Sequence, residues 1–329
     1  AATDYRYLTI GHVTDFTNKA LESLDLTGWE PELAEAVLSS LVRGIAQGTR
    51  QEENNTWRHP VDLVAILEAA FPKIEPALAE GHPKRGTWDG RVSLAWKLLE
   101  DDPEGNVAAL LKALRHGATE EQLAGAVVYA AALRIARFHT SNEFGDWDTT
   151  LHTYSFAHAV HMGLRRLATA ERTYGGPTNL LRGAFDAAMS VYLDRFLNIP
   201  AASIPDPCAS GPRPDAALHE LLPLLDRQQQ VNEAGELAAR ALDSKGDNGH
   251  KLLTVLGKAL LREDRDFHTI QTMEASFTEY TLARGAPEAA DFLIAAARYL
   301  AAHAPTVRAQ GQTYQIALRL HRGEQIFEA

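Results

Sequence analysis

The sequence predicts an all-α protein, a large helical bundle of about 12–16 helices that forms either one body or two helical subdomains. Apolar residues recur every three or four positions along almost the whole chain, which is the period of one helix face. Alanine is abundant, and the alternating apolar and polar runs that form half-buried strands are almost absent. With 45% hydrophobic and 23% charged residues, the 329-residue chain is typical of a globular protein with a sizeable core.

Helical periodicity is clearest in four stretches, which we expect to form helices: 32–47, 61–71, 92–100 and 290–303. Between them, Gly117 predicts the end of one helix, and Thr119 with Gln122 predicts a capping box at the start of the next. That next helix, expected over 120–139, is apolar nearly all round. A helix of this kind is usually buried at the centre of a bundle.

A proline-rich segment interrupts the helical pattern. The stretch 197–215 holds five prolines and a glycine, which predicts an irregular connection because proline lacks a backbone donor and fixes its own φ angle. We therefore expect an N-terminal helical part at 1–197, a connection at 198–215, and a C-terminal helical part at 216–329 that completes the functional site.

Charge and cysteine content restrict the classes of binding partner and the cellular compartment that we expect. A formal charge of −11 argues against nucleic acid and anionic membranes, which leaves a small molecule or a protein, including a second copy in a homodimer. The single cysteine, Cys208, excludes an internal disulfide and a cysteine-held cluster, and favours the reducing cytoplasm. No apolar run reaches the length of about 18 residues that predicts a membrane span, and the first residues show no signal-peptide pattern.

Chemistry-bearing residues gather at 138–161, FHTSNEFGDWDTTLHTYSFAHAVH, which contains four histidines and three carboxylates. His139 and Glu143 lie one turn apart if the preceding helix continues through them. Several imidazoles in a buried layer are costly to desolvate without a purpose, so this cluster predicts a metal held by nitrogen and oxygen. The paired Glu-x-x-His motifs of di-iron bundles are absent, which disfavours a carboxylate-bridged di-iron site.

The other histidines have a simpler interpretation. Lone histidines at helix ends usually cap a helix or pack in the core, and we interpret five of them in this way: His12, His82, His116, His219 and His321. Trp57, Trp88 and Trp147 are interpreted as packing anchors.

Four segments, taken in order, resemble the questin oxidase-like family of helical oxygenases. LVRGIAQGTRQEENNTWRHPVDLVAILEA (41–69) resembles its helix end leading to a His-Pro, and LHTYSFAHAVHMGLRRL (151–167) resembles its His-x-x-Thr/Ser-x-x-His-Ala helix. NLLRGAFDAAMSVYLDR (179–195) and DNGHKLLTVLGKALLRE (247–263) are similar to its leucine-led helix and its Asp-x-Gly-His helix. The resemblance implies oxidation of an aromatic or polyketide-like small molecule by O2 at a single non-heme iron.

The resemblance also implies a ligand set. Carried over, the histidine ligands are His59, His152 or His158, and His250, while His139 is added from local spacing alone. The family's carboxylated lysine has no direct counterpart, because Leu253 stands in its place; Lys258, within about 80° of His250 on a helix, is the better candidate.

A weaker resemblance is to the helical part of bacterial proteins that also contain a Rieske domain. This chain has no Rieske ligand set, so we expect either a truncation at Ala329 or an external Rieske or ferredoxin electron donor.

The sequence also indicates which side chains would support the metal and the substrate, and it leaves two alternative functions open. Glu143 or Asp148 would fix histidine tautomers or move a proton, and Tyr154 with Trp147 would line an apolar pocket. One alternative is a heme protein with His139, His158 or His250 as the axial ligand. The other is a non-enzymatic helical scaffold that binds a protein partner.

Overall fold

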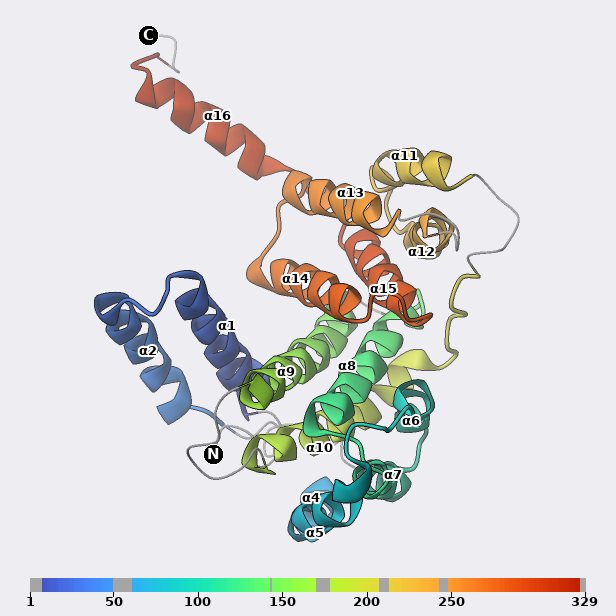
Figure 1. The fold of residues 1–329 in the computed structure, drawn as a ribbon. Helices are drawn as coiled ribbons and strands as arrows, with labels where there is room; N and C mark the ends of the chain where they lie inside the picture. Colours follow the sequence, from blue (N-terminus) through green and yellow to red (C-terminus); the bar gives the residue numbers. More distant parts are fainter. Residues whose placement is uncertain are drawn as a thin grey trace. The chain divides into compact units, whose positions relative to one another are not determined.

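The prediction of an all-α protein is confirmed. The computed structural model describes residues 8–49, 61–142, 144–169, 178–206, 213–242 and 248–325, and all regular structure in these ranges is helical (Figure 1). The helices expected from periodicity are found as α2 (Pro31–Ala46), α4 (Leu63–Ala70), α6 (Arg91–Leu98) and α15 (Ala289–Ala302). None of the described helices is both long and apolar enough to cross a membrane.

The chain divides into two compact units. The first unit comprises residues 1–134 and 148–201, and the second comprises 135–147 and 202–329. One boundary, between 201 and 202, therefore falls within the proline-rich segment 197–215, of which residues 199–206 have no regular structure. The other two fall inside the helices α8 (Glu120–Ala136) and α9 (Phe144–Thr169).

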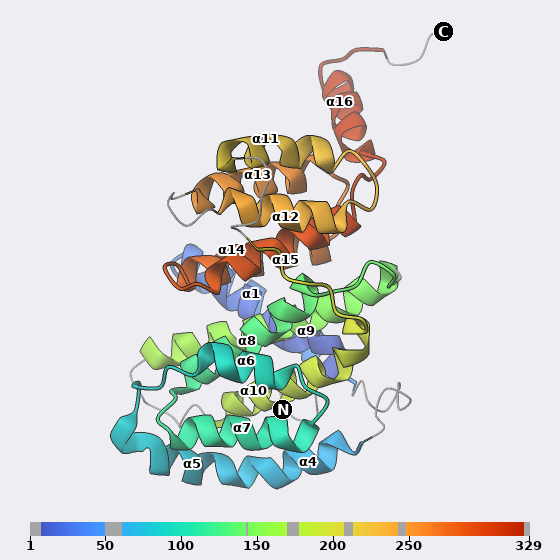
Figure 2. The same cartoon turned by 90° about the vertical axis from the view of Figure 1, so that its right-hand side faces the viewer.

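The first unit is built round α8, α9 and α10 (Thr178–Leu193). From Leu123 to Ala136, every side chain of α8 except the two at 125 and 134, a glycine and an arginine, is apolar and buried, as its all-round apolar sequence predicts. On the outside, α7 (Pro103–Arg115) packs against α4 and α5 (Ile74–Gly81), which follow one another in Figure 2. Helices α1 (His12–Leu26) and α2 form an adjoining pair.

The turn between α7 and α8 follows its sequence signals. The amide of Ala118 donates to the carbonyl of Ala113 (3.0 Å) and that of Gly117 to Leu114 (3.0 Å), the two bonds of a Schellman motif. Gly117 has φ 95°, and a Cβ built on it would collide with the carbonyl of Lys84. The predicted capping box also forms: the Thr119 amide bonds the Gln122 side chain (2.9 Å), and the Gln122 amide bonds the Thr119 hydroxyl (3.1 Å).

A buried arginine fixes the end of α8 within the first unit. The Arg134 guanidinium, only 3% exposed, donates to the carbonyls of Val191 and Leu99 and to the side-chain oxygen of Asn198, each at 3.0 Å. Asn198 returns a bond to the Arg134 carbonyl at 3.0 Å. The charge is thus compensated by acceptors, which a buried cation requires.

The second unit packs its helices round α15. Helix α15 contacts three others, α12 (Val231–Ala241), α13 (Gly249–Arg262) and α14 (Phe267–Leu282), and α11 (Pro214–Leu224) covers α12 and α13 (Figure 2). Arg298, 1% exposed, donates to the Asn232 side chain (2.9 Å) and to the carbonyl of Phe138 (2.6 Å). Burial lowers the pKa of Arg298 to about 10.

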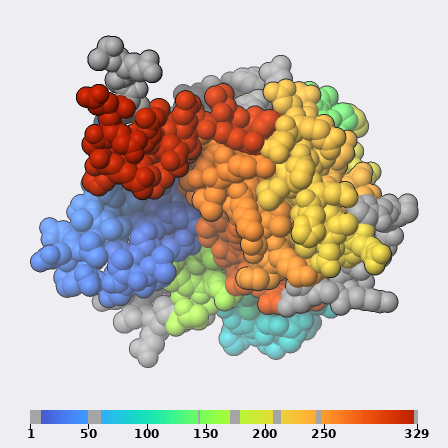
Figure 3. Space-filling model, turned by 90° about the horizontal axis from the view of Figure 1, so that it is seen from above, coloured from blue at the N-terminus to red at the C-terminus, as the bar shows by residue number. Residues whose placement is uncertain are grey.

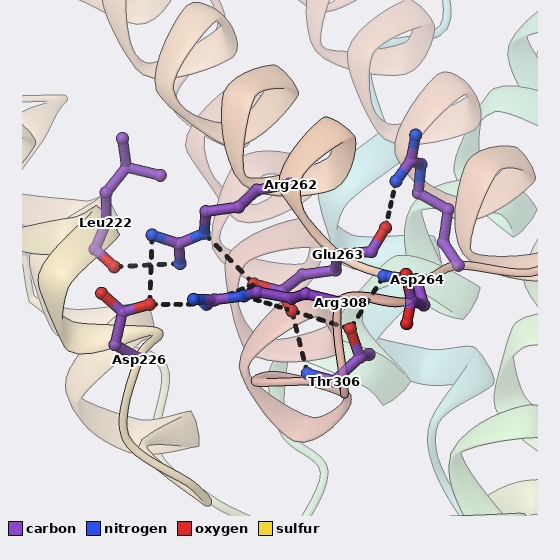
Figure 4. A network of polar contacts seen from close by, with 8 residues as sticks. Leu222, Asp226, Arg262, Glu263, Asp264, Thr306 and Arg308 are labelled. Carbon is purple, nitrogen blue, oxygen red and sulfur yellow. Dashed lines mark hydrogen bonds and ion pairs between the residues drawn. The ribbon is translucent and has the colours of Figure 1, made fainter. Parts of the chain in front are cut away.

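An ionic network joins the end of α13 to the start of α16 (Ala309–His321). Figure 4 shows Arg262, Thr306 and Arg308 gathered round Glu263, a residue that is 5% exposed. Arg308 Nη2 lies 2.8 Å from Glu263 Oε1, and the Thr306 amide donates to Oε2 at 2.8 Å. The neighbouring Asp264 accepts the amide of Gln310 at 2.8 Å, which caps α16. No α16 side chain is buried, and this network holds the helix at its base.

Candidate metal centre

Helix α9 presents its histidines to two neighbours within the first unit. His152 lies beside α1, since its ring centroid is 4.9 Å from that of His12. His158 also faces α1, with a ring nitrogen within 4.8 Å of a carboxylate oxygen of Glu22. His161 instead faces α8, because a Cβ built on Gly125 would lie 3.4 Å from its Nε2. The three buried histidines therefore do not form one cluster.

A glycine explains why α1 approaches α9 so closely. Gly11 caps α1 in the left-handed region (φ 92°), and a Cβ there would lie 2.8 Å from Cβ of Phe156 and 3.5 Å from the His152 carbonyl oxygen. At the other end of α1, Asp25 forms an ion pair with Arg166 of α9. The two helices therefore run side by side in the same direction, and the next residue after Gly11 is His12.

The His12–His152 pair is a candidate position for a metal ion. Nδ1 of His152 lies 2.5 Å from the carbonyl oxygen of Asp148, which can only accept, so Nδ1 bears the proton. In the neutral ring, Nε2 then holds the lone pair that a metal needs, and such a carbonyl partner is common behind metal-bound histidines. One ring nitrogen of His12 and one of His152 lie within 4.8 Å of each other, which makes the pair a candidate site for one ion. The donor set fits iron or another metal of similar ligand preference.

The pair formed by Glu22 and His158 provides a second, more polar environment. Glu22 accepts from the Asn18 side chain at 2.8 Å and from Lys19 Nζ at 2.9 Å. His158 is 1% exposed, and Asn18 is 4% exposed. Glu22 is therefore a carboxylate already held by two donors, which fits a partner that orients an imidazole or accepts its proton.

An apolar groove of about 730 Å³ lies between α1 and α2, and His12 is among the residues that line it. Its walls are mostly apolar, with Val13, Phe16, Leu41 and Ile45 among them. The His12 ring stacks on Phe16, with centroids 5.3 Å apart. The volume is that of a typical small-molecule site, and the His12–His152 pair adjoins it.

Some of the predicted site residues have different surroundings from those expected. The helix expected to run through His139 ends at Ala136, because the carbonyls of Arg137 and Phe138 accept from Ala202 and Arg298 instead of from the next turn. Nδ1 of His139 lies 2.7 Å from the Ser141 hydroxyl and accepts the Ser141 amide. The condition for a one-turn spacing to Glu143, a helix that continues through His139, is therefore not met, and Glu143 itself lies outside the described residues.

The remaining predicted residues fall in both units. His250 and Lys258 lie on α13 of the second unit, and both are exposed. Tyr154 of α9 is completely buried. In the second unit, Trp147 packs on Phe138 with ring centroids 4.2 Å apart, as expected of a packing anchor. His59 and Trp57 lie outside the described residues.

Two residues of the centre were not predicted from the sequence. The sequence favours a structural role for His12 and gives no signal at Glu22, because neither belongs to a local motif. The contact between His12 and His152 joins positions far apart in the chain, and the glycine before His12 is the only local signal of a close approach.

No family model, curated protein or solved structure matches the chain. The resemblance to questin oxidase-like enzymes therefore stays a prediction.

Proposed function

We propose that the protein is a metal-dependent oxidoreductase, specifically a mononuclear non-heme iron oxygenase that acts on an aromatic or polyketide-like small molecule with O2. The observation that supports this most is the His12–His152 pair, with the His152 tautomer fixed by the Asp148 carbonyl. Two imidazoles do not complete a catalytic centre. His59, from the predicted ligand set, is the proposed third ligand.

Iron bound there would supply the redox chemistry by which dioxygen oxidises the substrate. The chain's own residues would position the reactants. Asp148 keeps the His152 ring in one tautomer, and the α1–α2 groove offers a flat apolar substrate a dry surface next to His12. Glu22 accepts two hydrogen bonds near His158 and would hold a proton or orient that ring.

Other parts of the proposal rest on the sequence. Tyr154 and Glu143 are the proposed catalytic side chains, and His139, His250 and Lys258 remain further candidate ligands. Electrons would come from a ferredoxin-type or Rieske protein, because one cysteine cannot hold a cluster. The same lone cysteine supports a cytoplasmic location.

The test is metal analysis of tag-free protein and of two single variants. Wild-type protein should bind iron near one equivalent, and His152→Ala should lose most of it. His116→Ala is the matched control, because the His116 Nδ1 also bonds a carbonyl four residues earlier (2.7 Å) but lies exposed at the end of α7. It should keep its iron.

Two results would overturn the proposal. One is wild-type protein that holds less than about a tenth of an equivalent of any transition metal after loading. The other is equal metal content in His152→Ala and His116→Ala. A visible spectrum of the loaded protein distinguishes a heme protein from one with histidine-bound iron, because heme gives an intense Soret band.

A further inference from the structure

Helix α2 has far more apolar surface than its contacts cover. Its apolar residues span an arc of about 180° from Leu33 through Leu41 and Leu38 to Val42. A helix packed on one neighbour needs an apolar stripe of only about 100°. Among the described residues α2 packs on α1, and no α2 side chain is buried.

The uncovered part of this arc is a continuous outer stripe. Leu38 is 40% exposed, Val42 63% and Ile45 47%, and the three follow one another at intervals of four and three residues. This is the spacing of a helix–helix seam. In Figure 3 the atoms of α2, in the lighter blue, lie at the surface. Ile45 also lines the α1–α2 groove, but Leu38 and Val42 do not, so the stripe extends beyond the groove onto a separate surface at these two residues.

The charges on α2 favour one kind of partner. Its first half carries Glu32 and Glu35 and its second half carries Arg43, with no acid after Glu35. A copy of the same helix laid antiparallel across it would bring each acidic half against the other copy's Arg43. A parallel copy would instead oppose like charges. Leu38 of each copy would then lie opposite Val42 of the other, near the two-fold axis.

We propose that two copies of this chain associate through the outer stripe of α2, as an antiparallel α2–α2 pair that joins two α1–α2 hairpins into a four-helix bundle. This pairing covers the apolar arc that α1 leaves exposed. Isologous symmetry requires only one self-complementary surface, which α2 supplies in both charge and apolar pattern.

The first test measures the mass of the full-length protein by light scattering and sedimentation over a range of concentrations. Wild-type protein should be a dimer. Val42→Glu should raise the dimer dissociation constant at least about 100-fold, because it places a charge in an apolar seam. Leu261→Glu is the matched control, since Leu261 is 72% exposed on α13 and lies outside the stripe, and it should stay dimeric.

The second test checks the antiparallel arrangement. In a Cys208→Ser background, a mixture of Leu38→Cys and Val42→Cys chains should form a disulfide-linked heterodimer faster than either variant alone. Reversing Arg43 to Glu should weaken the dimer, and adding Glu35→Arg in the same chain should restore it. Circular dichroism checks that each variant is folded.

Four outcomes would refute the inference: a monomeric wild type, a dimer unaffected by Val42→Glu, cross-linking without preference for the mixed pair, or purification with a different protein seated on α2. None of these bears on the metal content of the protein. The proposed association and the proposed enzyme activity can therefore be refuted independently of each other.

Discussion

Replacing Glu263 with glutamine should destabilise the second unit by about 3 kcal/mol. Burial alone would raise the pKa of Glu263, but hydrogen bonds from Arg308 and Thr306 outweigh it and hold the pKa at about 2, against an ordinary value of 4.5. At about 1.4 kcal/mol per pH unit, this difference gives the stated figure. Glu263 is 5% exposed, so solvent screens these bonds less than it would screen a pair with both partners exposed.

The same difference between the folded and unfolded pKa of Glu263 predicts how the free energy of unfolding depends on pH. Because the folded pKa lies below the unfolded value, the stabilisation is complete above about pH 4.5 and is lost as the pH falls toward about 2. The Glu263→Gln variant lacks this titrating group. Its stability should therefore fall less than that of the wild type across the window.

The assay is urea unfolding followed by circular dichroism at pH 7 and at intervals down to pH 3. Glu324→Gln is the control, because Glu324 pairs with Arg319 at 2.8 Å where both side chains are nearly half exposed. Such surface pairs contribute under about 1 kcal/mol. If the two variants lost equal free energy of unfolding, or if Glu263→Gln kept the wild-type pH profile, the pKa argument would be wrong.

Two further changes test the packing of the first unit. Gly117→Ala should lower the free energy of unfolding by about 3 kcal/mol or more, because a Cβ there meets the Lys84 carbonyl and the residue also has a positive φ. Gly86→Ala is the control: Gly86 also has a positive φ, but a Cβ there would have nothing within 4 Å, so the loss should be only about 1–2 kcal/mol. Equal shifts of the thermal unfolding temperature in the two variants would contradict this. Arg134→Met should cost about 3 kcal/mol, because it leaves two buried acceptors and one part-buried acceptor without their donor. Denaturant unfolding measures this cost, and a loss under about 1 kcal/mol would contradict the role of the arginine.

The fold was predictable because helix formation depends on local pattern. The capping box of Thr119 and Gln122 and the glycine stop at Gly117 each involve residues within one or two turns, and both form as predicted. The helix expected through His139 failed for the opposite reason. Arg298, far along the chain, takes the Phe138 carbonyl, and no local pattern reveals that contact.

The candidate site was predictable only in part. His152 and His158 stand out because they lie in a histidine-rich helix that is buried. Their partners on α1, His12 and Glu22, are determined by how α1 packs on α9, which depends on contacts between distant segments. A histidine-rich segment therefore identifies one wall of such a site, and the opposite wall has to come from the structure.

The left-handed glycine at the start of α1 has a consequence for any attempt to engineer this centre. Gly11 offers no donor atom, yet a side chain there would push α1 away from Phe156 and carry His12 with it. The separation of the two imidazoles is thus set by how closely Gly11 approaches Phe156 and the His152 carbonyl on α9. Transplanting the histidines into another bundle would reproduce their chemistry and lose their spacing unless the glycine, with its unusual φ, were transplanted as well.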